Sequence, residues 1–297
     1  MATTLTPDTG EETKAPDRIG SGRTQGPRHW NWPGGLAGWL WLAIVIIPIY
    51  WILITSFKTS ANYFDANPLK PPTDLTFENY KLVIQEHFIR YFFNSLIVTI
   101  GAVVPAVLIS FMAAYAIVRG RGRFLWSTNA MFLAGLAIPL QATIIPVYLI
   151  IIRLKLYDTL LAIILPSIAF ALPLSVLVLS NFIRDVPNEL FESMRVDGAS
   201  EWKTLWNLAF PLSRPALVTV TIYNGLLIWN GFLLPLVLTQ SPDKRTLPLA
   251  LSAFQGQYTV NVPAVLASVV LTTLPILTLY VIGRRQLLSG LTAGFGK

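Results

Sequence analysis

Residues 91–118 read YFFNSLIVTIGAVVPAVLISFMAAYAIV and contain no charged side chain. A helix needs about 20 apolar residues to cross the hydrocarbon core of a bilayer, and this run is long enough. Similar runs recur along the chain, so we expect an all-α, polytopic membrane protein with about six transmembrane helices. The expected spans are residues 36–57, 91–118, 124–152, 159–183, 215–241 and 264–283.

The composition also favours a bilayer. Charged residues make up 12% of the 297 residues, against about 25% in soluble domains. The absence of cysteine excludes disulfides and thiolate metal sites. His29 and His87 lie far apart in polar stretches and are interpreted as solvated loop residues, so we expect no metal site. The net charge of +7 fits basic cytoplasmic loops beside anionic lipid headgroups, and we expect no nucleic-acid partner.

The orientation follows from the positions of Lys and Arg, which favour short cytoplasmic loops. The densest such loop is residues 119–123, RGRGR. With this loop inside, both termini are cytoplasmic. Residues 1–35 are then a disordered cytoplasmic tail, residues 36–283 the membrane domain, and residues 284–297 a cytoplasmic C-terminal tail. The first span is expected to remain as an uncleaved anchor, since no signal-peptide cleavage pattern follows it.

The interior of the expected spans contains no Asp, Glu, Lys, Arg or His. A charge at the centre of a helix costs roughly 2.5–3.5 kcal/mol on insertion scales and usually marks function. Its absence argues against a proton relay, although sodium can bind backbone carbonyls at broken helices. It also removes the ligands or base of an intramembrane hydrolase. Prolines within the spans have two open interpretations, helix packing or broken helices that shape a cavity. They are Pro48, Pro105, Pro139, Pro146, Pro166, Pro173, Pro235 and Pro275.

The loop formed by residues 185–214 reads DVPNELFESMRVDGASEWKTLWNLAFPLSR and is rich in acidic residues. Its pattern predicts two short amphipathic helices. Pro187 suits the first turn of the first helix. Gly198 can adopt the left-handed conformation that ends it, and Asp197 can cap the second helix. The sequence therefore predicts a cytoplasmic two-helix loop with a hinge.

The first of these helices suits a protein partner better than a lipid surface. Leu190, Phe191 and Met194 share one face, and Glu189 and Glu192 make the helix acidic, so anionic lipid would repel it. A helix that lies in a groove of a soluble partner, with the three apolar residues as anchors, is the favoured interpretation. An interfacial helix resting on lipid is the alternative.

This loop resembles the cytoplasmic signature of the permease subunits of ATP-binding-cassette importers, at Glu192-Ser193-Met194, Gly198 and Leu208-Ala209-Phe210-Pro211. Ser193 and Met194 replace the two alanines of the family's Glu-Ala-Ala pattern. The rest of the chain, from about residue 36, resembles the smaller permease of maltose-type sugar transporters. The matching pieces are Phe93-Asn94-Ser95, Ala114-Tyr115-Ala116 before Arg119, Ile138-Pro139, Asp197-Gly198-Ala199, Trp229-Asn230, Arg245-Thr246-Leu247-Pro248-Leu249 and the ending Gly290-Leu291-Thr292-Ala293-Gly294.

The resemblance implies that the chain is one of two different permeases that pair to form a sugar pathway in a bacterial or archaeal plasma membrane. ATP and Mg²⁺ are bound by a separate ATPase dimer, so this chain is not an enzyme and carries no cofactor. An extracytoplasmic binding protein delivers the sugar and contacts the outer loop at residues 240–263. The residues implied in coupling to the ATPase are Glu189, Leu190, Phe191, Glu192, Met194, Asp197, Gly198 and Glu201.

Polar side chains inside the spans are candidates for the pathway, because unpaired amides in hydrocarbon are costly and should face a cavity or another helix. Hydrogen bonding between helices is the alternative for each. A secondary transporter or channel for small polar solutes, working without ATP, is the alternative for the whole chain. The identity of the sugar is left open. The candidates are Asn94, Gln141, Asn224, Trp229 and Asn230.

Overall fold

The computed structural model describes residues 32–65, 67–251 and 260–293. The chain divides into two units, residues 1–47 and 48–297. The predictions for His29 and for most of the N-terminal tail fall outside the described residues, as do the last four residues of the C-terminal tail. The middle of the predicted outer loop, residues 252–259, also falls outside them.

The first long helix, α1 (Trp32–Ser56), begins before the predicted span and contains Pro48. Its 25 residues cover roughly 37 Å at 1.5 Å per residue, more than the hydrocarbon thickness of about 30 Å. The helix runs through residues 32–35, which the sequence assigned to a disordered tail. No charged residue interrupts it, so nothing prevents the helix from starting at Trp32.

The described part of residues 48–297 is mostly helical. After α2 (Ser60–Asp65) and α3 (Glu78–Val83), a short π-helical segment, η1 (Ile84–Phe88), leads into the long helix α4 (Ile89–Arg119). Glu86 and His87 are non-helical in η1, and His87 has φ of 62°. His87 is exposed at this kink, as predicted. The helix α7 (Leu160–Arg184) follows the prediction closely.

The third predicted span, residues 124–152, is wrong as a single helix. The structure contains α5 (Arg123–Gly135) and α6 (Leu140–Arg153), bent by 109°. Pro139 precedes α6 with extended backbone angles, φ −73° and ψ 135°. A proline disfavours helical geometry at the residue before it and lacks the amide that the turn would use, so the helix stops at this point.

The fifth predicted span, residues 215–241, is also wrong as a single helix. It divides into α11 (Arg214–Trp229) and α12 (Leu233–Leu238). Pro235 lies in the first turn of α12, and its ring would clash with the carbonyl of Gly231 in a continuous helix. The final helix, α14 (Val262–Ala293), contains the sixth predicted span and extends well into the predicted C-terminal tail. Asn261 caps it by accepting a 3.2 Å hydrogen bond from the Ala264 amide.

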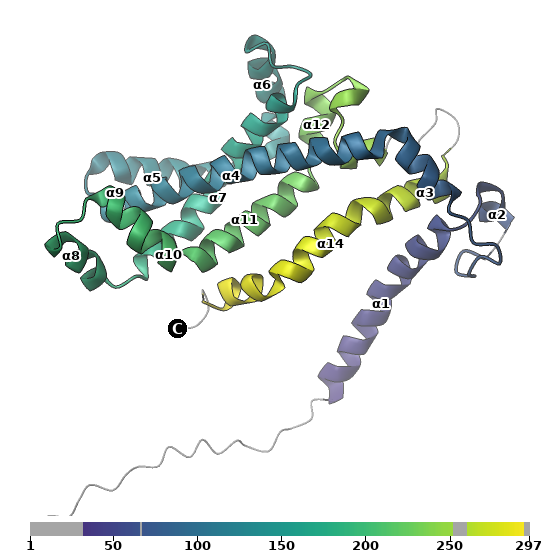
Figure 1. Ribbon diagram of the computed structural model, residues 1–297, viewed down its shortest axis with the longest axis horizontal. Helices are drawn as coiled ribbons and strands as arrows, with labels where there is room; N and C mark the ends of the chain where they lie inside the picture. Colours follow the sequence, from purple (N-terminus) through teal and green to yellow (C-terminus); the bar gives the residue numbers. More distant parts are fainter. Residues whose placement is uncertain (1–31, 66, 252–259, 294–297) are drawn as a thin grey trace, which may run out of the picture. The chain divides into compact units, whose positions relative to one another are not determined.

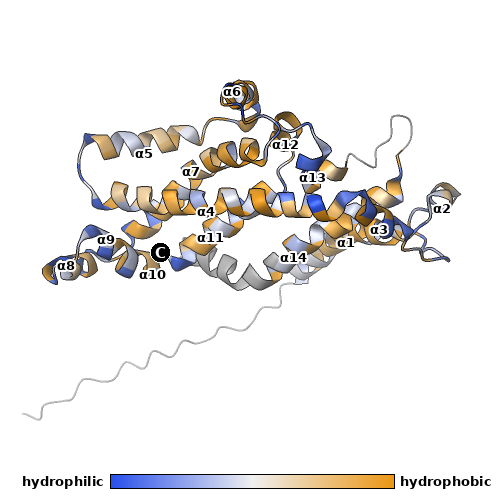
Figure 2. Ribbon diagram, turned by 45° about the horizontal axis from the view of Figure 1, so that its top comes forward, coloured by the Kyte–Doolittle hydropathy of each residue, from blue (hydrophilic) through white to orange (hydrophobic). Residues whose placement is uncertain are grey.

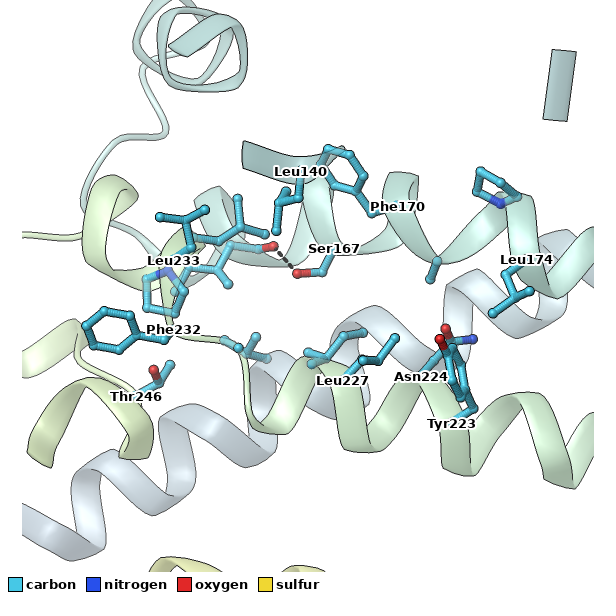
Figure 3. Close-up of a pocket in the computed structure, with 18 of the residues that line it drawn as sticks. Leu140, Ser167, Phe170, Leu174, Tyr223, Asn224, Leu227, Phe232, Leu233 and Thr246 are labelled. Atoms are coloured by element: carbon cyan, nitrogen blue, oxygen red, sulfur yellow. Dashed lines mark hydrogen bonds between the residues drawn. The ribbon is translucent and has the colours of Figure 1, made fainter. Parts of the chain in front are cut away.

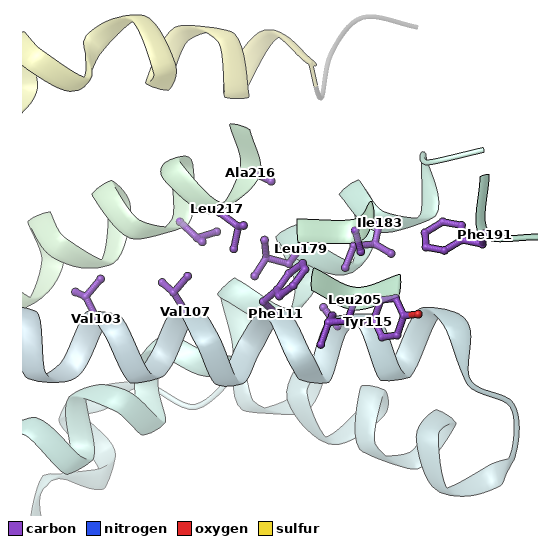
Figure 4. Packing of buried hydrophobic residues seen from close by; sticks show 13 residues of the cluster. Val103, Val107, Phe111, Tyr115, Leu179, Ile183, Phe191, Leu205, Ala216 and Leu217 are labelled. Carbon is purple, nitrogen blue, oxygen red and sulfur yellow. The ribbon is translucent and has the colours of Figure 1, made fainter. Parts of the chain in front are cut away.

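The core of residues 48–297 is built around α4, which packs against α7 and α11, while α11 also packs against α14 (Figure 1). Gly101 permits the close approach of α4 and α7, since a Cβ at that position would lie 3.1 Å from Ile164 Cδ1. Small residues at helix contacts are typical of packing in membranes. Figure 4 shows Val103, Val107 and Phe111 along α4, facing Leu179 of α7 and Leu217 of α11.

Polar residues gather at two ends of this unit. Figure 2 shows them on α8 (Asn188–Val196) and α9 (Glu201–Thr204) at one end and on α2 and α3 at the other. Three helices in the described part of the chain are long and apolar enough to cross a membrane, or four if the bent α5–α6 pair counts as one span. The apolar part of α14, Val262–Thr278, is shorter.

Candidate functional site

The 185–214 loop forms the two-helix arrangement that the sequence predicts. Helix α8 ends in a Schellman motif, with Gly198 N donating to Arg195 O at 3.0 Å and Ala199 N donating to Met194 O at 2.9 Å. Gly198 has φ of 71°, a left-handed conformation that only glycine adopts without strain. The prediction of a glycine hinge between the helices is confirmed at the level of backbone geometry.

The predicted cap of the second helix is wrong. Asp197 is the C-cap of α8, whereas Ser200 caps α9 by accepting a hydrogen bond from the Lys203 amide at 3.3 Å. The sequence suggested a break at Asp197 and Gly198 alone. In the structure α8 ends at Val196 and α9 begins at Glu201, so the break also includes Ala199 and Ser200, and Ser200 becomes the cap. Pro187 also lies one position earlier than predicted, at the N-cap of α8. After α9 the chain continues through a π-helical segment, η2 (Leu205–Ala209), and α10 (Phe210–Leu212).

The eight predicted coupling residues differ in their exposure to solvent. Most of them face solvent, with Leu190 at 40% exposure, while Met194 is half-buried. Phe191 is 1% exposed. The exposed members are Glu189, Leu190, Glu192, Asp197, Gly198 and Glu201.

The role of Phe191 as an anchor for a partner is therefore wrong. Its ring packs inside this chain, with its centroid 6.4 Å from that of Tyr115 and 4.0 Å from the guanidinium carbon of Arg119. Successive helix residues point about 100° apart, so Leu190 remains outside while Phe191 turns inward. The spacing places both residues on one broad face, and only the neighbouring α4 decides which of them is covered.

We expect Phe191→Ala and Leu190→Ala to differ sharply. Loss of the buried ring should lower the free energy of unfolding by about 3–5 kcal/mol, whereas Leu190→Ala should leave it within about 0.5 kcal/mol of wild type, as for surface positions. Thermal unfolding of the detergent-purified chain measures both changes. Equal destabilisation by the two substitutions would contradict the assignment of Phe191 to the core.

Glu201 joins the loop to α4. Its Oε2 accepts a 2.7 Å hydrogen bond from the Tyr115 hydroxyl, and its Oε1 accepts one of 2.9 Å from Arg195 Nη2. The Tyr115 hydroxyl and the Arg195 guanidinium both favour the ionised carboxylate and hold the pKa of Glu201 below its usual value. Tyr115 lies in a motif quoted above, but it was not predicted as a site residue, because nothing local in the sequence connects it to Glu201.

A cavity of about 410 Å³ lies between α4, α7, α11 and the α5–α6 bend, with α12 at one side. Figure 3 shows Tyr223 and Asn224 at one end and Phe232 and Thr246 at the other. The lining is mostly apolar. The Thr246 hydroxyl is buried without a hydrogen-bond partner among the described residues. Ser167, Phe170 and Tyr223 also line the cavity. The sequence did not single them out, since isolated residues of these types are common in membrane helices.

Of the five pathway candidates, Asn224 alone lines this cavity. Its amide also donates a 2.8 Å hydrogen bond to Ser175 Oγ across to α7. Trp229 is buried beside Phe92, with ring centroids 5.8 Å apart. Gln141 is exposed at the start of α6, and Asn230 caps α11 by donating to Leu226 O at 2.8 Å. The structure does not bring the five side chains together.

The fifth candidate, Asn94, holds the segment that follows α12. Its amide donates to Asp243 O at 2.8 Å and Arg245 O at 2.9 Å. The adjacent Ser95 hydroxyl accepts from the Leu247 amide at 2.9 Å. Asn94 is 8% exposed, and both amide hydrogens are used, so it has a structural role as a tether for residues 243–247.

Asp158 holds the same segment from the other side. Oδ1 of this side chain accepts hydrogen bonds of 2.9 Å from the amides of both Gln240 and Ser241, and Oδ2 accepts from the Ser241 hydroxyl. These bonds, led by that of the hydroxyl, hold the pKa of Asp158 below its usual value. Asp158 has φ of 60°, a conformation that Asp and Asn tolerate better than most residues.

We expect Asp158→Asn to lower the free energy of unfolding by roughly 1–2 kcal/mol at neutral pH, after allowing for solvent screening. Since the folded pKa is depressed, the ionised form stabilises the fold above the unfolded pKa of about 3.9 and this contribution is lost as the pH falls through the folded value. Melting curves from pH 7 to pH 3 measure it. Asp74→Asn, at an exposed position, is the control, and an unchanged acid dependence in Asp158→Asn would contradict the assignment.

Apolar helices around a solute-sized cavity, a polar helical loop at one end and a tethered segment at the other define a polytopic membrane transport protein. Residues 97–287 match the family of binding-protein-dependent transport system inner membrane components, and the chain belongs to this family. It is therefore a membrane-embedded transport subunit. This membership decides against the secondary transporter or channel that the sequence left open.

Curated relatives cover most of the chain. A putative ABC transporter permease protein, ORF2, of Caldicellulosiruptor sp. (strain Rt8B.4) is 39% identical over 86% of this chain and 93% of its own length. The diacetylchitobiose uptake system permease protein NgcG of Streptomyces coelicolor is 33% identical over 86% of this chain and 85% of its own length.

A solved structure has the same fold. One chain of the crystal structure of a bacterial ABC transporter involved in the import of the acidic polysaccharide alginate matches with a TM-score of 0.75. The match covers 85% of this chain and 96% of that one at 21% sequence identity.

Proposed function

We propose that this chain is one of two permease subunits of an ATP-driven carbohydrate importer. With a second permease it forms the translocation pathway, and it receives sugar from an extracytoplasmic binding protein. It docks on a dimer of ATP-binding-cassette ATPases, which bind ATP and Mg²⁺. The observation that carries this proposal is the 185–214 loop, which presents an acidic helix with an exposed Leu190 and a glycine hinge, on a chain of the importer family.

The docking surface is the outward side of α8. Glu189, Glu192 and Asp197 give it a negative charge, and Leu190 with part of Met194 supplies apolar area. An acidic, amphipathic helix is suited to a groove with apolar walls and basic rims, and poorly suited to anionic lipid. Phe191 is excluded from this surface by its burial.

The proposed topology has six spans, with α5–α6 and α11–α12 as broken spans and both termini in the cytoplasm. Two sets of loops support it. Arg119 Nη1 donates to Asn188 Oδ1 at 2.7 Å, so the basic 119–123 loop and the 185–214 loop lie on one side. Asp158, Asn94 and Arg90 all bond residues 240–247, which supports a common location for residue 158, the start of α4 and residues 240–247 on the other side.

The cargo is proposed to be a neutral mono- or oligosaccharide. No Asp, Glu, Lys, Arg or His is among the residues that line the cavity in the described chain, while Phe170, Tyr223 and Phe232 offer aromatic faces and Asn224 and Thr246 offer hydrogen-bonding groups. Sugars are recognised by this combination of ring faces and polar groups. The relative NgcG is named for uptake of diacetylchitobiose, which makes amino-sugar disaccharides the first class to test.

The test begins with the extracytoplasmic binding protein of the proposed importer. Its melting temperature is measured with diacetylchitobiose, maltose, trehalose and galacturonic acid, and the sugar that raises it is used in uptake by proteoliposomes that contain both permeases and the ATPase. We expect uptake of a neutral sugar only with ATP inside and binding protein outside. Uptake without ATP, or a shift with galacturonic acid alone, would overturn the proposal.

A further inference from the structure

The last two turns of α4 touch both helices of the 185–214 loop. Tyr115 and Arg119 are four residues apart and so lie on one face of the helix. They belong to the motif Ala114-Tyr115-Ala116 before Arg119. This motif is not part of the proposed docking surface on α8. Tyr115 is 7% exposed, so most of its side chain is covered by this chain itself.

The first contact ties α4 to the loop across the Gly198 hinge. The Glu201 carboxylate takes one hydrogen bond of 2.7 Å from the Tyr115 hydroxyl and another of 2.9 Å from Arg195 Nη2. Arg195 lies in α8 and Glu201 in α9, so one carboxylate connects three helices. Hydrogen bonds to an ionised group are about twice as strong as neutral ones.

The second contact ties α4 to the start of α8. Arg119 donates to Asn188 Oδ1 at 2.7 Å, and its guanidinium carbon lies 4.0 Å from the centroid of the Phe191 ring. An arginine over an aromatic face is attracted by the ring as well as by its hydrogen-bond acceptor. Together the two contacts, which we call the α4 clamp (Tyr115, Arg119, Asn188, Phe191, Arg195 and Glu201), hold both limbs of the loop.

The rest of α4 leads from the clamp to the parts of the chain that handle solute. Phe111 is fully buried beside α7 and α11. Ser95 and Val98 line the cavity, and Asn94 and Ser95 hold residues 243–247. A single helix, Ile89–Arg119, therefore touches the loop, the cavity and the outer segment.

We propose that α4 is the element that carries movement of the 185–214 loop to the cavity and the outer segment, and that Tyr115 and Arg119 are the positioning residues that make the loop and α4 move together. The inference rests on the proposed docking of the loop on an ATPase. The competing route is through α7 and α11, which are joined to the loop covalently. In that case the clamp would contribute stability alone.

The absence of cysteine makes the test direct. Single spin labels are placed through Val196→Cys on the loop, 87% exposed, and Ile97→Cys on the outer half of α4, 50% exposed. Electron paramagnetic resonance spectra of the assembled complex are compared without nucleotide and with ATP plus vanadate. In the otherwise wild-type chain both labels should respond. If the spectrum of the Val196 label does not change in that chain, the docking proposal itself is refuted. This result is distinguishable from one in which the Val196 label responds and the clamp variants have no effect.

Tyr115→Phe removes the hydroxyl that joins α4 to the loop, and Glu201→Gln removes the negative charge that strengthens the two hydrogen bonds; both preserve size. With either change we expect the Val196 label to respond as before and the response of the Ile97 label to be lost. Sugar moved per ATP hydrolysed should fall about tenfold, the scale of one charge-assisted hydrogen bond. The double substitution should be no worse than either single one, because the two side chains act as one link.

Tyr148→Phe is the matched control, since this tyrosine lies in α6, away from the loop, and packs edge-on against Tyr157. It should leave both labels and the transport ratio unchanged. A full response of the Ile97 label in Tyr115→Phe would overturn the proposal. Loss of both responses in that variant would overturn it as well, because the clamp would then be needed for docking rather than for transmission.

Discussion

Replacement of Gly198 by proline is expected to abolish uptake while capture of sugar by the binding protein persists. Gly198 has φ of 71°, and proline fixes φ near −65°. Proline would also remove the amide that donates to Arg195 O at 3.0 Å. Each of these two effects of proline prevents the Schellman motif from forming, so α8 and α9 lose their relative orientation. ATP-dependent uptake in proteoliposomes, with ligand binding measured separately, detects the loss.

Gly198→Asn and Gly198→Val distinguish the effect of backbone conformation at the hinge from the effect of adding a side chain there. Asparagine enters the left-handed region more readily than other non-glycine residues, whereas a β-branched residue there is a genuine outlier. Nothing lies within 4 Å of a Cβ built at Gly198, so steric conflict with neighbours does not confuse the comparison. We expect substantial uptake with asparagine and little with valine. Full activity of the proline variant would show that the hinge geometry is unnecessary.

Glu192→Lys is expected to reduce uptake by two orders of magnitude or more without loss of the fold. Glu192 is exposed on α8, and no hydrogen bond or ion pair of its side chain is found among the described residues. Reversal of its charge therefore leaves the chain's own packing intact. At an interface, disruption of one member of a buried charge pair costs about 2–5 kcal/mol, which corresponds to a loss of affinity of roughly 30- to 4,000-fold.

Co-purification with the ATPase is the direct measurement for Glu192→Lys, and the melting temperature of the purified chain confirms its fold. Glu86→Lys serves as the matched charge reversal, because Glu86 is also exposed but lies in the kink before α4, on the opposite side from the loop in the proposed topology. It should retain the ATPase and normal uptake. Normal co-purification of Glu192→Lys would remove Glu192 from the docking surface.

Local patterns in the sequence were sufficient to predict those features whose conformation depends on neighbouring residues alone. The charge-free runs located α1, α4, α7 and the apolar part of α14, since hydrocarbon leaves a helix as the main way to satisfy backbone amides. Gly198 was expected to be left-handed, and it is. Each of these features depends on residues within a few positions of one another.

The effect of proline on a helix could not be predicted from local sequence. Pro105, Pro166 and Pro173 lie inside continuous helices, whereas Pro139 and Pro235 stand where spans break. The same residue type gives both results, because neighbouring helices decide whether a freed carbonyl is tolerated or the chain turns away. A Cβ at Gly135 would lie 3.1 Å from Pro173 Cγ, so the end of α5 is shaped by contact with α7, which no local pattern reveals.

The charge-free stretch at residues 91–118 determined by itself that this chain crosses a membrane, and the 185–214 loop determined its two helices and hinge. Tertiary structure decided the role of each residue. It turned Phe191 inward and left Leu190 outside, made Asn94 a tether, and joined Tyr115 to Glu201 across 86 positions of sequence. Helix propensity and hydrophobicity act over a few residues, whereas such contacts exist only after distant helices have packed together.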